Sequence, residues 1–274
     1  MKHDWYQGKN VLITGAASGI GKDLALVLAQ NGAKLALIDL QPGILVEVQA
    51  QCSPQTLTFV ADIRDPERMS AIISEVLSKW GHVDVAIACA GVGGINPAPI
   101  FSQEIDAKVM AVNYTGTVNT LAPLIPSMMA RKSGNLVGIS SLAALRGLPF
   151  AASYSASKAA QMTWLESLRI DLKPHGIYVT SIHPGFVATP MAEHDEFKMP
   201  FKVGPRDSSN RILRAIAAGR SQYHYPFLIS FLARFNRLLP NFIYDFIMPR
   251  VSGRAPKSAK ILSALPSTAL TKGK

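Results

Sequence analysis

The chain has 274 residues, of which 48% are hydrophobic and 17% are charged, and its formal net charge is +10. That length suits one α/β domain with a large core and leaves too little for a comfortable second domain. The two cysteines, Cys52 and Cys89, lack the spacing of a metal site, and the N-terminus with Asp4 has no apolar signal core. The composition therefore argues against secretion and favours a reduced, cytoplasmic protein that holds no metal.

The first predicted strand, Asn10–Thr14, runs directly into a glycine-rich turn and a leucine-rich helical pattern. The spacing Gly-x-x-x-Gly-x-Gly at Gly15, Gly19 and Gly21 departs from the commoner Gly-x-Gly-x-x-Gly fingerprint. Gly15 permits a tight turn, Gly19 lets the backbone approach a pyrophosphate, and Gly21 allows close helix packing. Glycines that merely turn the chain are the alternative, but the order of strand, turn and helix favours a dinucleotide site.

A second predicted strand, Lys34–Ile38, ends at Asp39, which lies eighteen residues beyond Gly21 (39 minus 21). An acidic residue about 20 residues after such a turn accepts hydrogen bonds from the adenosine ribose. A 2′-phosphate at this position would meet a like charge, and neither Ala17 nor Leu40 supplies a cation to bind one. The sequence therefore predicts NAD rather than NADP.

Further buried strands and helical stretches alternate along the rest of the chain. This alternation is typical of an α/β protein with a single Rossmann-type, doubly wound parallel sheet and helices on both faces. The strands are expected at residues 57–60, 83–88, 135–139 and 178–182, and the helices around residues 69–80, 103–129 and 154–172.

Residues 109–130 contain no charged side chain and are long enough to suggest a membrane span. Two asparagines and two prolines within this stretch argue against that interpretation. We expect instead a helix that is buried against the sheet or against a neighbouring subunit.

Tyr154 and Lys158 lie four residues apart in the last of these helices, and Ser141 lies thirteen residues before Tyr154. Positions i and i+4 share one face of a helix, so the phenol and the ammonium would project together. A free phenol has a pKa of about 10, but a cation about 4 Å away at an effective dielectric constant of about 20 favours the phenolate by roughly 4 kcal/mol. A solvated helix edge is the commoner meaning of this spacing alone, and the accompanying motifs favour a proton-transfer pair.

Together these motifs resemble the short-chain dehydrogenase/reductase family, in its compact single-domain branch, from about Gly8 to about Pro205. Ala88-Cys89-Ala90-Gly91 stands where the family usually has Asn-Asn-Ala-Gly. We expect this departure to be structural, because that segment normally steadies the central sheet. The resemblance implies cofactor contacts at Gly15, Ser18, Gly19, Ile20, Gly21, Asp39, Asp62, Ile63, Ala90, Gly91, Tyr154, Lys158, Pro184, Gly185 and Thr189.

The resemblance further implies reversible hydride transfer between an alcohol carbon and a nicotinamide ring. Tyr154 would be the general acid/base, and Lys158 would lower its pKa and bind the nicotinamide ribose. Ser141, which its spacing favours over Ser140, would donate to the developing alkoxide. Asn113 would hold a water that links Lys158 to solvent. The alternative is a catalytically silent dinucleotide-binding or membrane-docked scaffold protein of the same fold, but binding alone needs no phenol of low pKa.

The substrate wall that the resemblance implies is mainly apolar and offers no paired lysine or arginine to bind a carboxylate. We therefore expect a small lipophilic substrate, a secondary alcohol or its ketone, with sterols, retinoids, long-chain alcohols and acyl-chain derivatives all open. His183 is expected to be a satisfied buried histidine, and residues 193–198 a substrate lid. Because the family commonly pairs subunits through its helices, a homodimer or homotetramer is implied. The wall residues are Gly93, Ala143, Leu148, Phe150, Phe186 and Met191.

The positive charge lies in the C-terminal quarter of the chain. Residues 1–197 carry 14 Lys and Arg against 16 Asp and Glu, a net charge of −2, whereas residues 198–274 carry 14 against 2, a net charge of +12. Residues 206–250 are expected to form a basic, aromatic-rich helical segment that completes one domain over residues 1–250, followed by a disordered tail at residues 251–274. An apolar helical stripe runs through Phe227, Leu228, Phe231, Leu232, Phe235, Leu238 and Leu239.

Three interpretations of that stripe stay open. In the first, the stripe packs over the substrate cleft as a lid or against another subunit. In the second, residues 221–250 lie in the interface of an anionic membrane. Nucleic-acid binding is the least favoured, because no recognised nucleic-acid module accompanies the aromatic residues. The segment cannot span a bilayer, since Arg234, Arg237 and Asp245 interrupt it. A cytoplasmic location is therefore expected, with peripheral attachment to a membrane surface as its variant.

Overall fold

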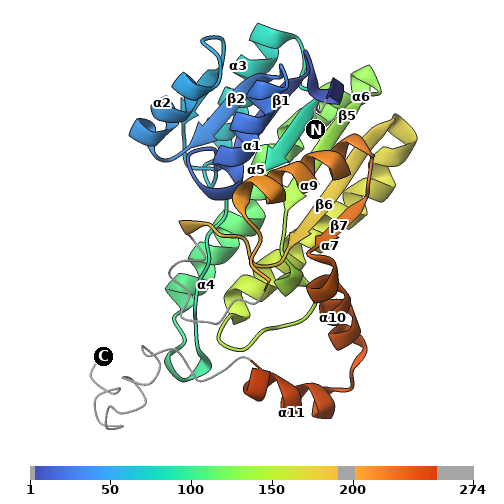
Figure 1. Cartoon of the computed structure of the whole chain (residues 1–274). Helices are drawn as coiled ribbons and strands as arrows, with labels where there is room; N and C mark the ends of the chain where they lie inside the picture. The colour runs from blue at the N-terminus through green and yellow to red at the C-terminus, as the bar shows by residue number, and fades with distance from the viewer. Residues whose placement is uncertain (1–3, 191–200, 252–274) are drawn as a thin grey trace.

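The computed structural model describes residues 4–190 and 201–251. Parallel strands form one sheet (Figure 1), namely β1 (Asn10–Thr14), β2 (Lys34–Asp39), β3 (Leu57–Val60), β4 (Val85–Ala88), β5 (Gly134–Ile139), β6 (Ile177–Pro184) and β7 (Gln222–Tyr225). Their order is β3-β2-β1-β4-β5-β6-β7, which confirms the predicted doubly wound sheet. The order reverses between β1 and β4, and ligands of such sheets bind at the carboxyl ends of the strands at that point.

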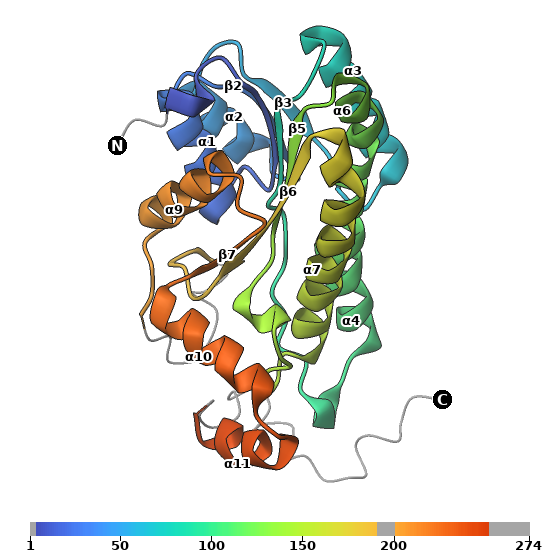
Figure 2. The same ribbon diagram turned by 90° about the vertical axis from the view of Figure 1, so that its right-hand side faces the viewer.

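Helices cover both faces of the sheet (Figure 2). One face carries α1 (Gly19–Gln30), α2 (Pro42–Gln51) and α9 (Pro205–Ala217). The opposite face carries α3 (Pro66–Trp80), α4 (Gln103–Met110), α5 (Gly116–Leu121), α6 (Ile125–Arg131) and α7 (Ala152–Leu172). Two more helices, α10 (Phe227–Leu238) and α11 (Asn241–Val251), follow β7 and lie beyond the sheet.

The core consists of two apolar layers, one on each side of the sheet. Successive side chains of a strand point to opposite faces, so Ile13 of β1 packs in the layer of α1 and α9, and Leu12 in the layer of α3 and α7. Leu24 of α1 and Met69 of α3 are completely buried in these two layers. Burial on both faces explains why the strands read as continuous apolar runs in the sequence.

The six expected strands are present, with ends that shift by no more than two residues. The expected helix at residues 103–129 is wrong as one element, because it is divided into α4, a π-helical turn at Ala111–Thr115, α5, a 3-10 turn at Ala122–Leu124 and α6. Pro123 lacks a backbone N–H and so favours a break there. Across residues 4–190 and 201–251, no helix is long and apolar enough to cross a membrane.

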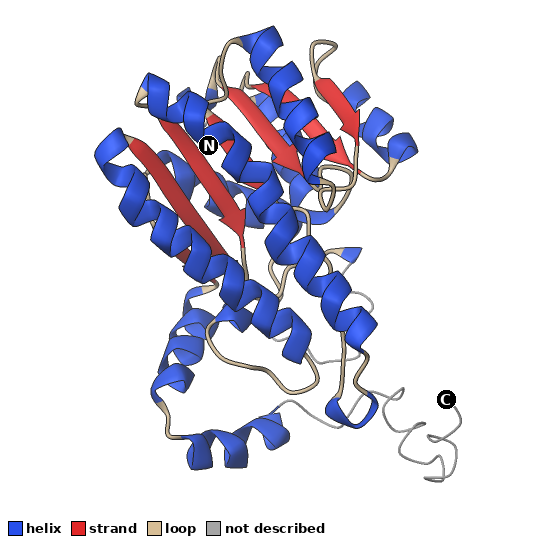
Figure 3. Cartoon of the chain, turned by 180° about the vertical axis from the view of Figure 1, so that it is seen from behind, coloured by secondary structure: helices blue, strands red, loops and turns tan. Residues whose placement is uncertain are grey.

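Helices α10 and α11, with the turn between them, form a C-terminal hairpin at residues 227–251. Figures 1 and 3 show this hairpin below the sheet, at one end of the molecule. The apolar side chains of α10 face solvent there, so the interpretation of the stripe as the packed inner face of a lid does not hold for the chain as described. Met191, the predicted lid at 193–198 and all of the predicted tail at 251–274 except Val251, which ends α11, lie outside the described residues.

Candidate active site

The glycine turn lies between β1 and α1, at the point where the strand order reverses. Gly15 has a φ of 70°, and a Cβ there would lie 2.7 Å from the backbone of Ala90 after β4. A Cβ on Gly21 would lie 2.0 Å from the carbonyl oxygen of Gly15. Only glycine fits these two positions, and the result is a turn that holds backbone N–H groups of α1 close to the ends of β1 and β4.

The carboxylate of Asp39 lies beside this turn at the end of β2. Its Oδ2 accepts a hydrogen bond of 2.9 Å from the backbone N–H of Ala17, and its Oδ1 accepts one of 3.1 Å from that of Gln41. Each carboxylate oxygen has a second lone pair, so both can still accept from a ribose hydroxyl. The structure thus places Asp39 where the sequence predicted it, within reach of the turn.

Tyr154 and Lys158 lie one turn apart on α7. The Nζ atom of Lys158 is 5.9 Å from the centre of the Tyr154 ring and donates a hydrogen bond of 2.8 Å to the carbonyl oxygen of Ile139 in β5. Lys158 is only 4% exposed, and this burial lowers its pKa to about 8. Its ammonium group is therefore fixed between α7 and the carboxyl end of β5, close to the phenol.

Asn113 joins the loop after β4 to α7. Its Nδ2 donates hydrogen bonds of 3.0 Å each to the carbonyl oxygen of Val92 and to Ser157 Oγ, and its Oδ1 accepts one of 2.8 Å from the Val92 N–H. Both hydrogens of the amide nitrogen are therefore used, so the predicted water would have to donate to an oxygen of Asn113. A Cβ on Gly91 would lie 3.1 Å from Asn113 Oδ1 and 3.4 Å from Lys158 Nζ, which brings these three predicted residues together.

The two serines after β5 have different surroundings. Ser140 is buried and donates a hydrogen bond of 3.0 Å to the carbonyl oxygen of Lys158, so it ties β5 to α7. Ser141 is partly exposed, and its Oγ accepts a hydrogen bond of 3.1 Å from the N–H of Ala143. The hydroxyl hydrogen of Ser141 can therefore point toward a substrate, which agrees with its selection over Ser140.

Sequence analysis missed a pair of stacked histidines, one of which contacts the backbone of Ser141. His183 at the end of β6 and His224 in β7 are paired in register, and their ring centres lie 4.3 Å apart with an angle of 9° between the planes. Burial lowers the pKa of His183 to about 4 and that of His224 to about 3, so both rings are neutral near pH 7.

The hydrogen bonds of the two rings assign their tautomers and connect α10 to Ser141. Nδ1 of His183 lies 3.2 Å from the carbonyl oxygen of Ser141 and must carry the hydrogen, whereas Nδ1 of His224 lies 2.7 Å from Nη2 of Arg234 and must accept. Both Nε2 atoms are buried without a hydrogen-bond partner among the described protein atoms. The expectation that His183 is a satisfied buried histidine is therefore wrong for one of its two nitrogens.

The remaining predicted cofactor residues lie along the same edge of the sheet. Thr189 lies against the glycine turn, since a Cβ on Gly19 would be 3.2 Å from its Cγ2. The N–H of Gly185, directly after Pro184, donates a hydrogen bond of 2.7 Å to the carbonyl oxygen of Tyr225. Gly19 follows the carboxyl end of β1, and Gly185 and Thr189 follow that of β6.

The predicted adenine contacts follow β3, farther along this edge. The carboxylate of Asp62 pairs with Arg64 at 2.6 Å, and the hydrogen bond with Arg64 lowers the pKa of Asp62. The carbonyl oxygen of Ile63 accepts a hydrogen bond of 2.9 Å from Asn119 of α5. The bond from Asn119 fixes the loop after β3 relative to α5, whereas the pair of Asp62 and Arg64 lies within the loop.

The described residues of the predicted substrate wall lie in loops at the same edge. Gly93 follows β4, Ala143, Leu148 and Phe150 follow β5, and Phe186 follows β6. No group of three or more potential metal ligands lies together in residues 4–190 and 201–251. These wall residues thus follow the carboxyl ends of three strands of the sheet.

The C-terminal hairpin holds the loop that carries Leu148, a contact that sequence analysis also missed. The guanidinium group of Arg146 donates hydrogen bonds to the carbonyl oxygen of Leu239, at 2.8 Å, and to Oδ1 of Asn241, at 2.9 Å, and it stacks 3.8 Å above the ring of Tyr244. In return, the hydroxyl of Tyr244 donates a hydrogen bond of 2.6 Å to the carbonyl oxygen of Gly147.

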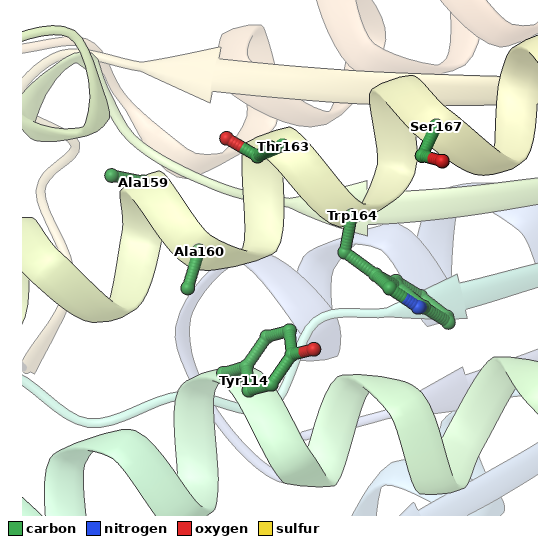
Figure 4. Close-up of a pocket in the computed structure, with 6 residues that line it drawn as sticks. All are labelled: Tyr114, Ala159, Ala160, Thr163, Trp164 and Ser167. Atoms are coloured by element: carbon green, nitrogen blue, oxygen red, sulfur yellow. The ribbon is translucent and has the colours of Figure 1, made fainter.

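A shallow hollow lies on another face of α7, where it meets the π-helical turn (Figure 4). Tyr114 projects from the π-helical turn toward Trp164 and Ala160 of α7 (Figure 4). The walls of the hollow are mostly apolar, and they belong to the helices through which the family resemblance predicts that subunits pair. The lining residues are Tyr114, Ala159, Ala160, Thr163, Trp164 and Ser167.

Comparison with known proteins agrees with this geometry. A family model described as short chain dehydrogenase matches residues 9–199. The chain belongs to the short-chain dehydrogenase family. An uncharacterized oxidoreductase of Myxococcus xanthus is 37% identical to this short-chain dehydrogenase over 245 residues, which cover 86% of this chain and 95% of the relative. Dehydrogenase/reductase SDR family member 7B of Bos taurus is 36% identical over 190 residues, which cover 65% of this chain but only 58% of that longer relative.

Solved structures of short-chain dehydrogenases have the same fold. The 3-ketoacyl-(acyl-carrier-protein) reductase of Brucella melitensis, complexed with NADH, is 26% identical with a TM-score of 0.75, covering 80% of this chain and 96% of that one. A short chain dehydrogenase of Mycobacterium paratuberculosis, bound to NAD, is 26% identical with a TM-score of 0.72, covering 80% and 96%.

Proposed function

We propose that this chain is a NAD-dependent oxidoreductase that interconverts a lipophilic secondary alcohol and its ketone by hydride transfer. The observation that supports this most strongly is the position of Lys158. Its buried Nζ lies 5.9 Å from the centre of the Tyr154 ring and beside Gly91, at the edge of the sheet where a dinucleotide fits. A candidate general acid/base and a cation that would favour its ionised form thus lie near Gly91, and the backbone of the preceding residue, Ala90, approaches Gly15 of the turn, which supports the proposal.

The glycine turn fits a nicotinamide dinucleotide. A side chain at Gly15 or Gly21 would collide with backbone atoms, so these glycines keep the turn tight, and the N-terminus of α1 can receive a pyrophosphate. Structural neighbours bound to NADH and to NAD support this cofactor class. The carboxylate of Asp39 beside Ala17 supports NAD over NADP, because a 2′-phosphate would be repelled. When bound, the dinucleotide would supply or accept the hydride.

Each residue of the site then has a defined task. In the oxidation direction Tyr154 takes the proton of the alcohol, and in reduction it returns that proton to the alkoxide. Lys158 is positively charged below its pKa of about 8 and favours the phenolate form of Tyr154. Ser141 donates a hydrogen bond to the substrate oxygen, and Asn113 holds the loop with Gly91 against α7.

The substrate is proposed to be lipophilic because the described wall residues are apolar or small. Arg146 is the one arginine in the loop between Ser141 and Phe150, and its guanidinium group is already bonded to Leu239 and Asn241 of the hairpin. A substrate carboxylate would therefore have to displace these bonds, at a cost in affinity. A neutral alcohol or ketone suits the site better.

We also propose that the protein forms a homodimer or homotetramer. The hollow between Tyr114 and Trp164 lies on helices of the kind through which this family pairs its subunits. A second copy would cover these partly exposed aromatic rings, which a single chain leaves in contact with water.

The decisive experiment measures NADH absorbance with a panel of lipophilic secondary alcohols, for the wild type and for Tyr154→Phe. We expect the substitution to lower kcat by about 10²-fold to 10⁴-fold, the usual contribution of general acid/base catalysis, while the affinity for NAD in calorimetry stays unchanged. Tyr178→Phe, at a tyrosine in β6 that is 57% exposed, is the matched control and should keep full activity.

Retained turnover in Tyr154→Phe would remove this residue from the proposed role. A wild type that binds NAD but turns over no compound of the panel, in either direction, would instead support the silent dinucleotide-binding alternative. The two results are distinguishable because calorimetry reports binding without chemistry.

A further inference from the structure

The C-terminal hairpin presents an apolar face that other described residues do not cover. Six apolar side chains of α10 form this face. On a helix with 3.6 residues per turn, they lie within an arc of about 140°. Their exposed fractions run from 46% at Leu232 to 82% at Phe227. Single exposed apolar residues are ordinary, but a continuous apolar face marks an interaction surface. The face consists of Phe227, Leu228, Phe231, Leu232, Phe235 and Leu238 of α10, and Phe242 and Phe246 of α11 in the same hairpin are exposed as well.

The charges around this face have one dominant sign. Residues 227–251 contain three arginines, Arg234, Arg237 and Arg250, and a single acidic residue, Asp245. The guanidinium group of Arg250 lies 3.8 Å over the ring of Phe246, so its stem covers apolar surface while its charge stays at the edge. An apolar face edged by arginines matches the acyl chains and phosphates of an anionic lipid surface.

The hairpin adjoins the proposed substrate loop. Arg146 and Gly147 are hydrogen-bonded to residues of the hairpin, and Leu148 follows them directly. α10 also begins right after the carboxyl end of β7, the edge of the sheet that carries Ser141. A surface that bound the apolar face would therefore lie next to the loops of the candidate active site.

We propose that the apolar face of the hairpin docks in the interface of an anionic phospholipid membrane, with its phenylalanines and leucines among the acyl chains and its arginines at the phosphates. A second copy fits less well, because two such faces would bring arginines against arginines with one aspartate each to offset them. Docking itself does not require hydride transfer. Delivery of a membrane-dissolved alcohol or ketone to the site is the added consequence, and that part rests on the proposed function.

Vesicle flotation with the full chain tests the proposal. We expect binding to phosphatidylcholine vesicles that contain phosphatidylserine, and at least about tenfold weaker binding to vesicles of phosphatidylcholine alone. Binding should fall as sodium chloride is raised, because salt screens the arginines. Phe231→Ser with Phe235→Ser should weaken binding at least about tenfold, and Arg237→Gln about fivefold.

The matched control replaces two apolar residues of similar exposure elsewhere, Leu40→Ser with Val46→Ser, each 60% exposed in the wild type. This double variant should bind vesicles like the wild type, and thermal melting should show every variant folded. Absence of vesicle binding by the wild-type chain overturns the proposal, as does equal binding to neutral and anionic vesicles. A hairpin variant that turns a dimer into a monomer without changing vesicle binding would assign the face to a second copy, which also overturns it.

Discussion

Leu37 in β2 is completely buried, whereas Phe235 in α10 is 52% exposed, although the first belongs to a continuous apolar run and the second to an apolar helical stripe. In the sheet, the apolar side chains of the strands pack against apolar side chains of helices on both faces, so the chain itself buries them. In the hairpin, the corresponding side chains of α10 stay 46–82% exposed. The difference shows that an apolar pattern predicts a covered surface but does not identify the surface that covers it.

The first prediction compares how much a side chain in each region contributes to the free energy of unfolding. Leu37→Ala should lower the free energy of unfolding by about 2–5 kcal/mol, because it removes buried contacts and leaves a cavity. Phe235→Ala should change it by less than about 1 kcal/mol, because more than half of that side chain is already in water. Urea denaturation of both variants measures the two values, and equal losses would show that the hairpin is part of the cooperative core.

The second prediction concerns the histidine pair that links these regions. The pKa of His183 is lowered to about 4 in the folded protein by burial, against an ordinary value of 6.5, so between these values the unfolded chain binds more protons. The free energy of unfolding should therefore fall as pH is lowered from about 6.5 to 4, by up to about 3 kcal/mol.

Two variants check the source of this pH dependence. His183→Gln retains an N–H donor for Ser141 and should remove the part of the dependence that comes from His183, leaving that of His224, whereas His175→Gln, at an exposed position, should leave the dependence unchanged. Parallel curves for wild type and His183→Gln would assign the effect to other groups.

The third and smallest effect tests the contact between the regions. Arg146→Ala removes the bonds to Leu239 and Asn241 and should cost about 1 kcal/mol of global stability. Hydrogen exchange of residues 145–150 should become faster, because the loop loses its support, while exchange in β2 stays unchanged. Arg237→Ala is the control within the hairpin. Unchanged exchange in the loop would mean that the hairpin does not hold it.

Much of the fold and the site could be predicted from local pattern. The glycine turn, Asp39 and the pair of Tyr154 and Lys158 are each read from short spacings, and a parallel sheet necessarily brings the carboxyl ends of its strands to one edge. That is why residues as far apart as Gly15 and Ser141 could be placed in one site. The predicted roles of these residues stay predictions until the variants are measured.

The features that were missed depend on contacts between distant segments. β7 has only four residues, three of them aromatic or histidine, and no alternation that distinguishes a strand from a loop. The stacking of His183 on His224 and the bonds of Arg146 to Asn241 join residues that no local spacing connects. The exposure of the apolar stripe was likewise undetermined, since amphipathic spacing is the same for a covered face and an uncovered one.

The π-helical turn at Ala111–Thr115 has a consequence for an assembled enzyme. Neighbouring residues of this turn serve two different surfaces: Asn113 is completely buried and holds the Val92 N–H, while Tyr114 lines the outer hollow. One peptide bond therefore joins the residue that fixes the loop after β4 to the residue on which a second subunit would pack. A second subunit that packed on Tyr114 would therefore act one residue away from Asn113, which holds the loop that carries Gly91.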